Sequence, residues 1–133
     1  MNGYLLDTSI CVAILRGNKS IATKLNAIGK GHCFINDVVL SELLVGAYKS
    51  ERTEDNLKAI EDFLSEIRVI PFAESVHVFA KERVKIWKTG NKIDDFDLLI
   101  GCAAKAKDLT MVTHNVRHFE HIDGIIIEDW IHQ

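Results

Sequence analysis

The chain has little of what marks several classes of protein. Its 133 residues include only one proline, and no apolar run approaches the roughly 20 residues that a membrane-spanning helix needs. No stretch is rich in proline, glycine and serine, so the sequence offers no flexible linker. The first residues lack the basic region of a signal peptide. We therefore expect one domain over residues 1–133, located in the cytoplasm and without a membrane partner.

Cysteine is also scarce, and basic residues are slightly outnumbered by acidic ones, 16 to 19. The three cysteines, Cys11, Cys33 and Cys102, lie far apart in apolar segments, which favours reduced core thiols over disulfides or a cysteine-based zinc site. The formal net charge is −3. Nucleic-acid-binding proteins usually show a strongly basic surface, and here basic residues gather only in residues 76–107.

Short apolar runs of strand length alternate with longer segments of helical periodicity. The expected strands are 3–6, 33–36, 68–71, 110–113 and 125–128. The expected helices are 9–16, 20–28, 37–49, 53–66, 74–89 and 95–107, and the helix 37–49 is expected to be largely buried. Strands separated by helical crossovers predict an α/β fold with a mainly parallel central sheet of about five strands, flanked by helices on both faces.

Four polar side chains interrupt apolar segments where this fold would bring them together. Asp7 ends the first expected strand, and Asn115 follows the fourth. Glu42 lies in the helix after the second strand, and Asp97 lies in the first turn of the helix before the fourth. Ligands of open α/β sheets bind beyond the carboxyl ends of the strands. We therefore expect all four side chains at one edge of the sheet.

The chemistry of this group predicts a divalent cation. Acidic side chains are rarely buried unless they are paired or bound to a cation. Oxygen ligands without cysteine or histidine suit a hard ion such as Mg²⁺ or Mn²⁺. Such an ion polarises a phosphoryl oxygen and lowers the pKa of a bound water, so the residues are suited to phosphodiester hydrolysis.

Each of these side chains also has a purely structural interpretation. Asp7 could cap the helix that starts near Ser9, and Glu42 could face solvent. Asn115 and Thr113 could form a turn, because asparagine favours such conformations.

Three acids begin the helix 95–107, namely Asp94, Asp95 and Asp97. Any of them could simply complement the helix dipole. Spacing alone does not select the one that would bind a metal.

Two further patterns lie outside the acidic group. His114, His118 and His121 have spacings of four and three residues and offer a rival zinc site. Lysines recur every three or four residues in one helical stripe beside an apolar row of Val76, Ala80, Val84 and Trp87. The stripe is either a solvated face or a contact for an RNA backbone, and its members are Lys81, Lys85, Lys88 and Lys92.

Four segments in this order resemble the PIN-domain nucleases, and more narrowly the VapC-type toxins of toxin–antitoxin pairs. They are Asp-Thr-Ser at residues 7–9, Leu-Ser-Glu-Leu at 40–43, Asp-Phe-Asp-Leu-Leu-Ile at 95–100, and Val-Thr-His-Asn at 112–115, the last followed by Phe119. The resemblance covers essentially the whole chain.

The resemblance implies that Asp7, Glu42 and Asp97 bind the metal and that Asn115 takes a position held by aspartate in many members. It also implies that Thr8 and Thr113 orient a carboxylate or a water, and Asp95 is a further supporting candidate. The activity implied is that of an Mg²⁺-dependent endoribonuclease, with Mn²⁺ as a substitute, that cuts structured RNA such as tRNA or ribosomal RNA. The implied partners are a second copy of the chain in a homodimer and a VapB-type antitoxin, whose C-terminal segment occupies the active-site groove.

Two other classes of function fit parts of the sequence. A receiver-like domain would use Asp7 as a phosphoacceptor, but it needs a lysine at the end of a late strand, and the expected strands 110–113 and 125–128 offer none. A non-catalytic binding domain would keep the acidic group only for metal-stabilised folding.

Overall fold

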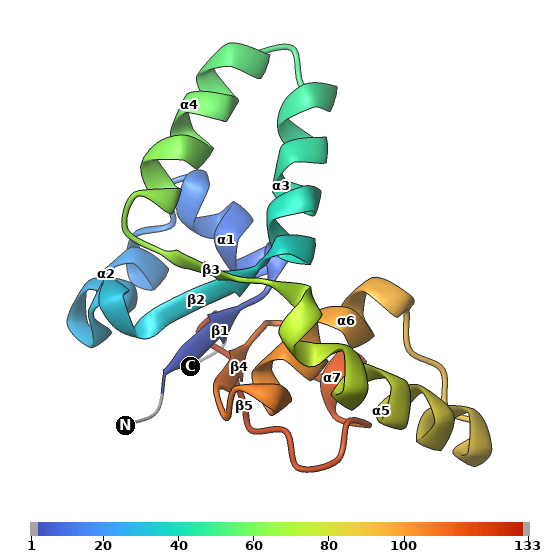
Figure 1. The fold of residues 1–133 in the computed structure, drawn as a ribbon. Coiled ribbons are helices and arrows are strands. Elements are labelled where there is room, and N and C mark those ends of the chain that lie inside the picture. Colours follow the sequence, from blue (N-terminus) through green and yellow to red (C-terminus); the bar gives the residue numbers. More distant parts are fainter. Residues whose placement is uncertain (1–2, 132–133) are drawn as a thin grey trace.

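The computed structural model describes residues 3–131, which form an α/β fold around one sheet. All strand pairings are parallel, and the strands lie in the order β3-β2-β1-β4-β5 (Figure 1). The strands are β1 (Tyr4–Leu6), β2 (Cys33–Asn36), β3 (Arg68–Ile70), β4 (Thr110–Val112) and β5 (Ile127–Glu128). The expected parallel sheet is confirmed, with strand ends that are shorter by up to two residues.

Helices cover both faces of the sheet, as expected. The helices are α1 (Thr8–Leu15), α2 (Lys19–Ile28), α3 (Asp37–Lys49), α4 (Thr53–Leu64), α5 (Val76–Thr89), α6 (Asp95–Ala106) and α7 (Val116–Phe119). Two 3₁₀ turns, η1 (Lys30–His32) and η2 (Phe72–Ser75), complete the elements. Figure 1 shows α1 to α4 on one side of the strands and α5 to α7 on the other. The short helix α7 was not expected from the sequence.

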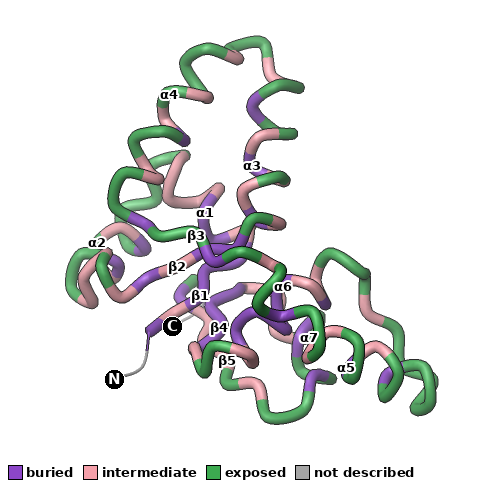
Figure 2. The backbone as a smooth tube through the Cα atoms, in the orientation of Figure 1, coloured by how far each residue is buried: buried purple, intermediate pink, exposed green. Residues whose placement is uncertain are grey.

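The core lies between the sheet and the inner faces of these helices. Leu5 and Leu6 on β1 and Met111 and Val112 on β4 are fully buried. Figure 2 shows the three inner strands β1, β2 and β4 as mainly buried and the outer ends of α4 and α5 as exposed. Apolar runs on central parallel strands are explained by this burial on both faces.

The expectation of a largely buried helix over residues 37–49 is wrong. In α3 the described core residues Val39, Leu43 and Ala47 recur every four positions, whereas Val45 and Tyr48 are 65% and 68% exposed. The helix pairs with α4 and leans away from the sheet (Figure 1), so its outer face has no covering layer within residues 3–131.

Helix α5 presents a different face to the core from the one its apolar row suggests. Val76, Val84 and Trp87 are exposed, whereas Glu82 is 2% exposed. Glu82 is buried because Lys105 of α6 lies against it, with Nζ···Oε1 at 2.6 Å. A paired carboxylate can occupy a core position that an unpaired one cannot.

The lysine stripe is also broken. Lys92 lies beyond the end of α5, where Gly90 turns the chain at a φ of 75°. Lys85 forms an exposed ion pair with Asp123 at 2.9 Å.

Within residues 3–131 no helix has the length and apolar character needed to span a membrane.

Candidate active site

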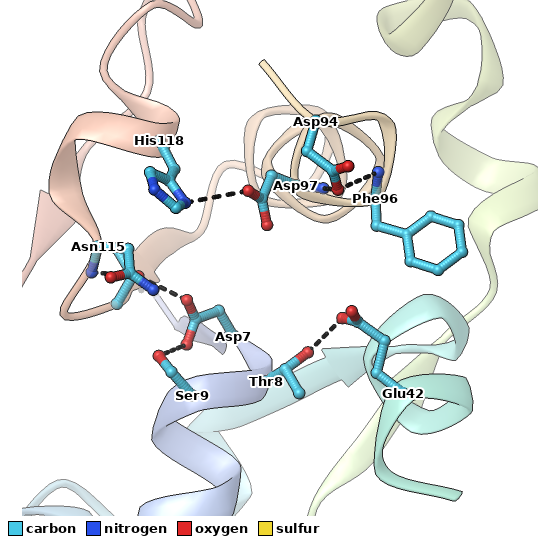
Figure 3. A network of polar contacts seen from close by, with 10 residues as sticks. Asp7, Thr8, Ser9, Glu42, Asp94, Phe96, Asp97, Asn115 and His118 are labelled. Carbon is cyan, nitrogen blue, oxygen red and sulfur yellow. Dashed lines mark hydrogen bonds and ion pairs between the residues drawn. The ribbon is translucent and has the colours of Figure 1, made fainter. Parts of the chain in front are cut away.

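Asp7 lies where β1 ends and α1 begins. Its backbone N–H donates to Val112 O of the neighbouring strand β4 at 3.0 Å, and this bond fixes the position of Asp7 relative to the end of β4. Its Oδ1 accepts from the backbone N–H of Ile10 at 3.1 Å and from the hydroxyl of Ser9 at 2.5 Å. The capping role is therefore real, and it leaves Oδ2 facing the site (Figure 3).

The second oxygen of Asp7 is held from the neighbouring strand. Thr113, buried at the end of β4, donates its hydroxyl hydrogen to Oδ2 at 2.5 Å. Asp7 is only 4% exposed, so three donors offset the cost of burying its charge. The expected orienting role of Thr113 has a direct structural counterpart in this contact.

Glu42 reaches the same region from α3. Its Oε1 accepts a hydrogen bond from Thr8 Oγ1 at 2.5 Å. Thr8 follows Asp7 directly, so this bond joins the second turn of α3 to the start of α1. Figure 3 shows the Glu42 carboxylate turned toward the end of α6 that carries Asp97.

Asp97 lies in the first turn of α6 and is half-buried. Burial raises the pKa of the Asp97 carboxyl above its ordinary value, and the negative charges of Asp94 and Glu42 act in the same direction. His118, whose Nδ1 is 3.1 Å from Asp97 Oδ2, opposes this shift. Figure 3 shows the Glu42 and Asp97 carboxylates facing the same region, in keeping with the small effect of Glu42 on the Asp97 pKa.

The other two acids of this turn have separate roles. Asp94 caps α6 by accepting from the backbone N–H groups of Phe96 and Asp97, at 3.0 and 3.4 Å. Asp95 is paired with Arg83 of α5. The structure thus brings Asp97 to the group and leaves the carboxylate of Asp95, expected to give support, in an ion pair outside it.

Asn115 directly precedes α7, three residues beyond the end of β4. Its backbone N–H donates to Thr113 Oγ1 at 2.9 Å, so the turn interpretation of these two residues also holds. Figure 3 shows the Asn115 side chain beside Asp7. The same turn therefore places an amide at the edge of the acidic group.

Asn36 is a positioning residue that the sequence reasoning missed. It is fully buried at the end of β2, and its Oδ1 caps α3 by accepting from Val39 N at 3.0 Å. Its Nδ2 donates to Leu99 O of α6 at 3.3 Å. Asn36 thereby fixes the helix of Glu42 against the helix of Asp97. The signal in the sequence was an asparagine directly before a helix start.

The donor set fits a hard divalent cation, although the side chains are not yet gathered around one point. Among residues 3–131 no three His, Cys, Asp or Glu side chains are oriented so that they could share an ion. Asp7, Glu42 and Asp97 nevertheless converge from α1, α3 and α6 on one region, each held by a neutral hydroxyl or an imidazole (Figure 3). The Glu42 and Asp97 side chains would have to rotate to exchange these partners for an ion, and a bound ion would relieve the mutual repulsion of the carboxylates.

The rival histidine site receives no such support. His118 turns toward Asp97, and residues 3–131 contain no group of histidines arranged to bind a metal.

Comparison with known proteins identifies the family to which this fold belongs. The model of the PIN domain family matches residues 4–125. The chain belongs to the PIN-domain family of nucleases. This PIN domain is 33% identical over 129 residues to the tRNA(fMet)-specific endonuclease VapC of Shigella flexneri, with 96% of this chain and 97% of that protein covered. It is 35% identical over 130 residues to the ribonuclease VapC2 of Rickettsia felis, at the same coverage. The expected membership of the VapC group is confirmed.

Solved structures of toxin–antitoxin complexes share the PIN fold closely. VapBC2 from Rickettsia felis, bound to a DNA fragment from its promoter, gives a TM-score of 0.89 at 33% identity, covering 96% of this chain and 98% of the other. DNA-bound VapBC from Salmonella typhimurium gives a TM-score of 0.91 at 31% identity, covering 98% and 99%.

Proposed function

We propose that this PIN domain is an Mg²⁺-dependent endoribonuclease and the toxin of a toxin–antitoxin pair, with Mn²⁺ as a substitute ion. The observation that carries the proposal is the convergence of Asp7, Glu42 and Asp97 beside Asn115, at the carboxyl ends of β1 and β4. The names of the VapC relatives support the activity. The Shigella relative is named for tRNA(fMet), which supports structured RNA, such as tRNA or ribosomal RNA, as the substrate class. Action on cellular RNA would take place in the cytoplasm.

In the proposed site some residues would bind the ion and others would position those ligands. Asp7, Glu42 and Asp97 would hold the ion, with the Asn115 side chain beside them. A bound Mg²⁺ supplies a water of lowered pKa and polarises the phosphoryl oxygen. Thr113 and Ser9 fix the direction of the Asp7 carboxylate, because both donate hydrogen bonds to it. Thr8 limits the rotation of Glu42 in the same way.

An antitoxin segment would find a suitable surface next to Glu42. A hollow of about 250 Å³ lies between α1, α3 and α4, and Glu42 and Arg16 lie at its polar side. Its apolar lining comes from Val12, Leu15, Leu43, Ala47 and Ile60. A peptide with an apolar side chain in this hollow would cover Glu42. The toxin–antitoxin complexes of similar fold support a VapB-type partner.

A homodimer is proposed from the exposed apolar residues on two helices. Tyr48 on α3 and Trp87 on α5 are 68% and 71% exposed. Exposed aromatic residues of this size are typical of protein interfaces. Sedimentation velocity of the free protein is expected to give a dimer, and a purely monomeric species across the accessible concentration range would exclude it.

The activity is tested by cleavage of total RNA with and without Mg²⁺. Wild-type protein should cut only with Mg²⁺ or Mn²⁺. Asp7→Asn should lower the cleavage rate by at least about 100-fold, because the substitution removes a negative charge that is proposed to hold the metal ion at the reacting phosphate. The matched control is Asp108→Asn, an exposed position with φ of 56° where asparagine is also favoured. Cleavage in EDTA, or equal activity of Asp7→Asn and Asp108→Asn, would exclude the proposal. Growth arrest on expression should follow the same pattern.

A further inference from the structure

A second hollow, of about 360 Å³, has Asp97 in its lining and no residue of α3. Its lining comes from the α5–α6 link, the start of α6 and α7, namely Lys92, Ile93, Asp94, Asp97, Arg117 and His118. It is called the cationic hollow below, because Lys92 and Arg117 are its permanently charged basic residues.

These two cations are exposed and unpaired. Within residues 3–131 neither Lys92 nor Arg117 forms an ion pair or a side-chain hydrogen bond. Other cations nearby are already engaged, because Lys85 contacts Asp123 and Arg83 contacts Asp95. The charge of the cationic hollow is therefore available to an external anion.

The acids that share the hollow are themselves occupied. Asp94 Oδ2 accepts two backbone hydrogen bonds at the start of α6, and Asp97 Oδ2 lies against His118. Asp97 is also one of the proposed metal ligands. The two acids keep their negative charges in the lining, but the hydrogen-bonded oxygens are already occupied, and a metal ion held by Asp97 would offset part of this charge. Lys92 and Arg117 are the side chains of the hollow with unoccupied donors.

The backbone beneath Arg117 is held by packing. Arg117 lies in α7, whose Phe119 is 1% exposed and packs on α6 at Gly101, where an added Cβ would approach Phe119 to 3.1 Å and Ile122 to 2.4 Å. Lys92 lies in the link between α5 and α6, after the left-handed turn at Gly90 and before the half-buried Ile93. Arg117 therefore has an anchored backbone and an exposed charged end, which suits binding a ligand in a defined place.

We propose that the cationic hollow binds a backbone phosphate of the RNA, next to the phosphate cut at the acidic group. The inference rests on the proposed function, and it assigns positioning of the strand to Lys92 and Arg117. The guanidinium of Arg117 can bind two phosphate oxygens at once, and the ammonium of Lys92 adds a second charge. A phosphate held here fixes the direction in which the strand passes Asp97, and phosphate contacts set register without reading sequence.

The test measures RNA binding without metal. All variants carry Asp97→Asn, which blocks cleavage and removes one negative charge beside the hollow. A fluorescent single-stranded oligoribonucleotide is titrated in EDTA by anisotropy at several salt concentrations. Lys92→Ala/Arg117→Ala is compared with Lys81→Ala/Lys88→Ala, which removes the same charge from exposed positions of α5 outside the hollow.

The double variant Lys92→Ala/Arg117→Ala, called the hollow pair, should weaken RNA binding roughly tenfold. It should also reduce the slope of log K against log salt by about 0.7 for each phosphate that the protein no longer neutralises. The control pair, Lys81→Ala/Lys88→Ala, should change the affinity and the slope little. Equal weakening by the two pairs would overturn the proposal, because charge in general would then explain binding. Failure of the Asp97→Asn parent to bind the oligonucleotide would overturn it as well.

Cleavage assays on proteins with Asp97 intact separate this inference from the proposed function. The hollow pair should raise KM severalfold with a small change in kcat. Cleavage by wild type with an unchanged KM in the hollow pair would contradict the phosphate site alone. Absence of cleavage by wild type with any RNA and metal would contradict the nuclease, even where the hollow pair still weakens RNA binding.

Discussion

Thr113 at the end of β4 donates a hydrogen bond to Asp7 at the end of β1, and the oxygens are 2.5 Å apart although the residues are 106 positions apart in the chain. The same hydroxyl oxygen accepts the backbone N–H of Asn115. One side chain therefore links three parts of the proposed active site. Because it is buried, its loss cannot be replaced easily by bulk water.

Thr113→Val keeps the shape of this side chain and removes the hydroxyl. We expect a loss of about 1–3 kcal/mol in the free energy of unfolding, since a buried carboxylate and a backbone N–H both lose a partner. Urea unfolding followed by fluorescence measures this, and RNA cleavage should fall in parallel. Thr113→Ser retains the hydroxyl and should keep most of the activity. A valine variant as active as wild type would show that the bond does not hold Asp7 for catalysis.

Asn36 connects the helices of Glu42 and Asp97 and gives a second prediction. Asn36→Asp keeps the cap on Val39 N but cannot donate to Leu99 O. It also introduces a charge at a fully buried position. We expect a loss of about 1–3 kcal/mol in unfolding free energy and a lower cleavage rate. Asn18→Asp is the control, because Asn18 also caps a helix through its Oδ1 but is exposed; equal losses in both variants would contradict a bridging role for Asn36.

The buried Glu82 and the partly exposed Lys105 should show strong coupling. Lys105→Met leaves Glu82 with Lys85, 3.8 Å away, as its remaining charged partner, and we expect destabilisation of about 1–3 kcal/mol. Adding Glu82→Leu should recover much of that loss, because an apolar pair fills the same space between α5 and α6. Thermal and urea unfolding of wild type, both single variants and the double variant give the free energies of unfolding for a double-mutant cycle. Additive effects would mean that the two residues do not interact energetically.

The buried thiols predict how stability depends on alkaline pH. Burial raises the pKa of Cys33 to about 11 and that of Cys102 to about 12, and the pKa of Cys11 well above its ordinary value of 9.0. The unfolded chain releases these protons at lower pH than the folded chain. Stability is therefore complete below about pH 9 and falls as pH rises toward the folded values.

Urea unfolding at about pH 8 and about pH 10 measures this fall. Cys102→Ala should show a smaller difference between the two conditions, because one titrating thiol is gone. The native thiols should also react slowly with a disulfide reagent at about pH 8 and all react after unfolding. Rapid reaction of the folded protein would contradict the burial of these side chains.

Much of the fold and of the candidate site could be predicted because the relevant signals are local. Apolar runs indicated the strands, and Gly17, Gly29 and Gly90 marked helix ends, where they adopt positive φ. A parallel sheet brings strand ends to one edge, and that rule placed Asp7 and Asn115 together.

The parts that failed depend on contacts between distant segments. The burial of Glu82 could not be seen without knowing that Lys105 faces it. The separate roles of Asp94 and Asp95 depend on the direction of each side chain around one helical turn and on Arg83 of α5. Spacing along a single helix contains none of this information. The metal-binding set remains a prediction on which the cleavage experiments decide.

The central position of β1 in the sheet sets when a newly made chain can first become active. As translation proceeds, β1 can pair with β2, and β2 with β3, so the nascent chain gains Asp7 and Glu42 early. The opposite edge of β1 stays open until β4 emerges with Thr113 and Asn115 behind it. The proposed metal site therefore cannot be completed on a growing chain until β4 has been made, because the open edge of β1 is the edge that β4 covers.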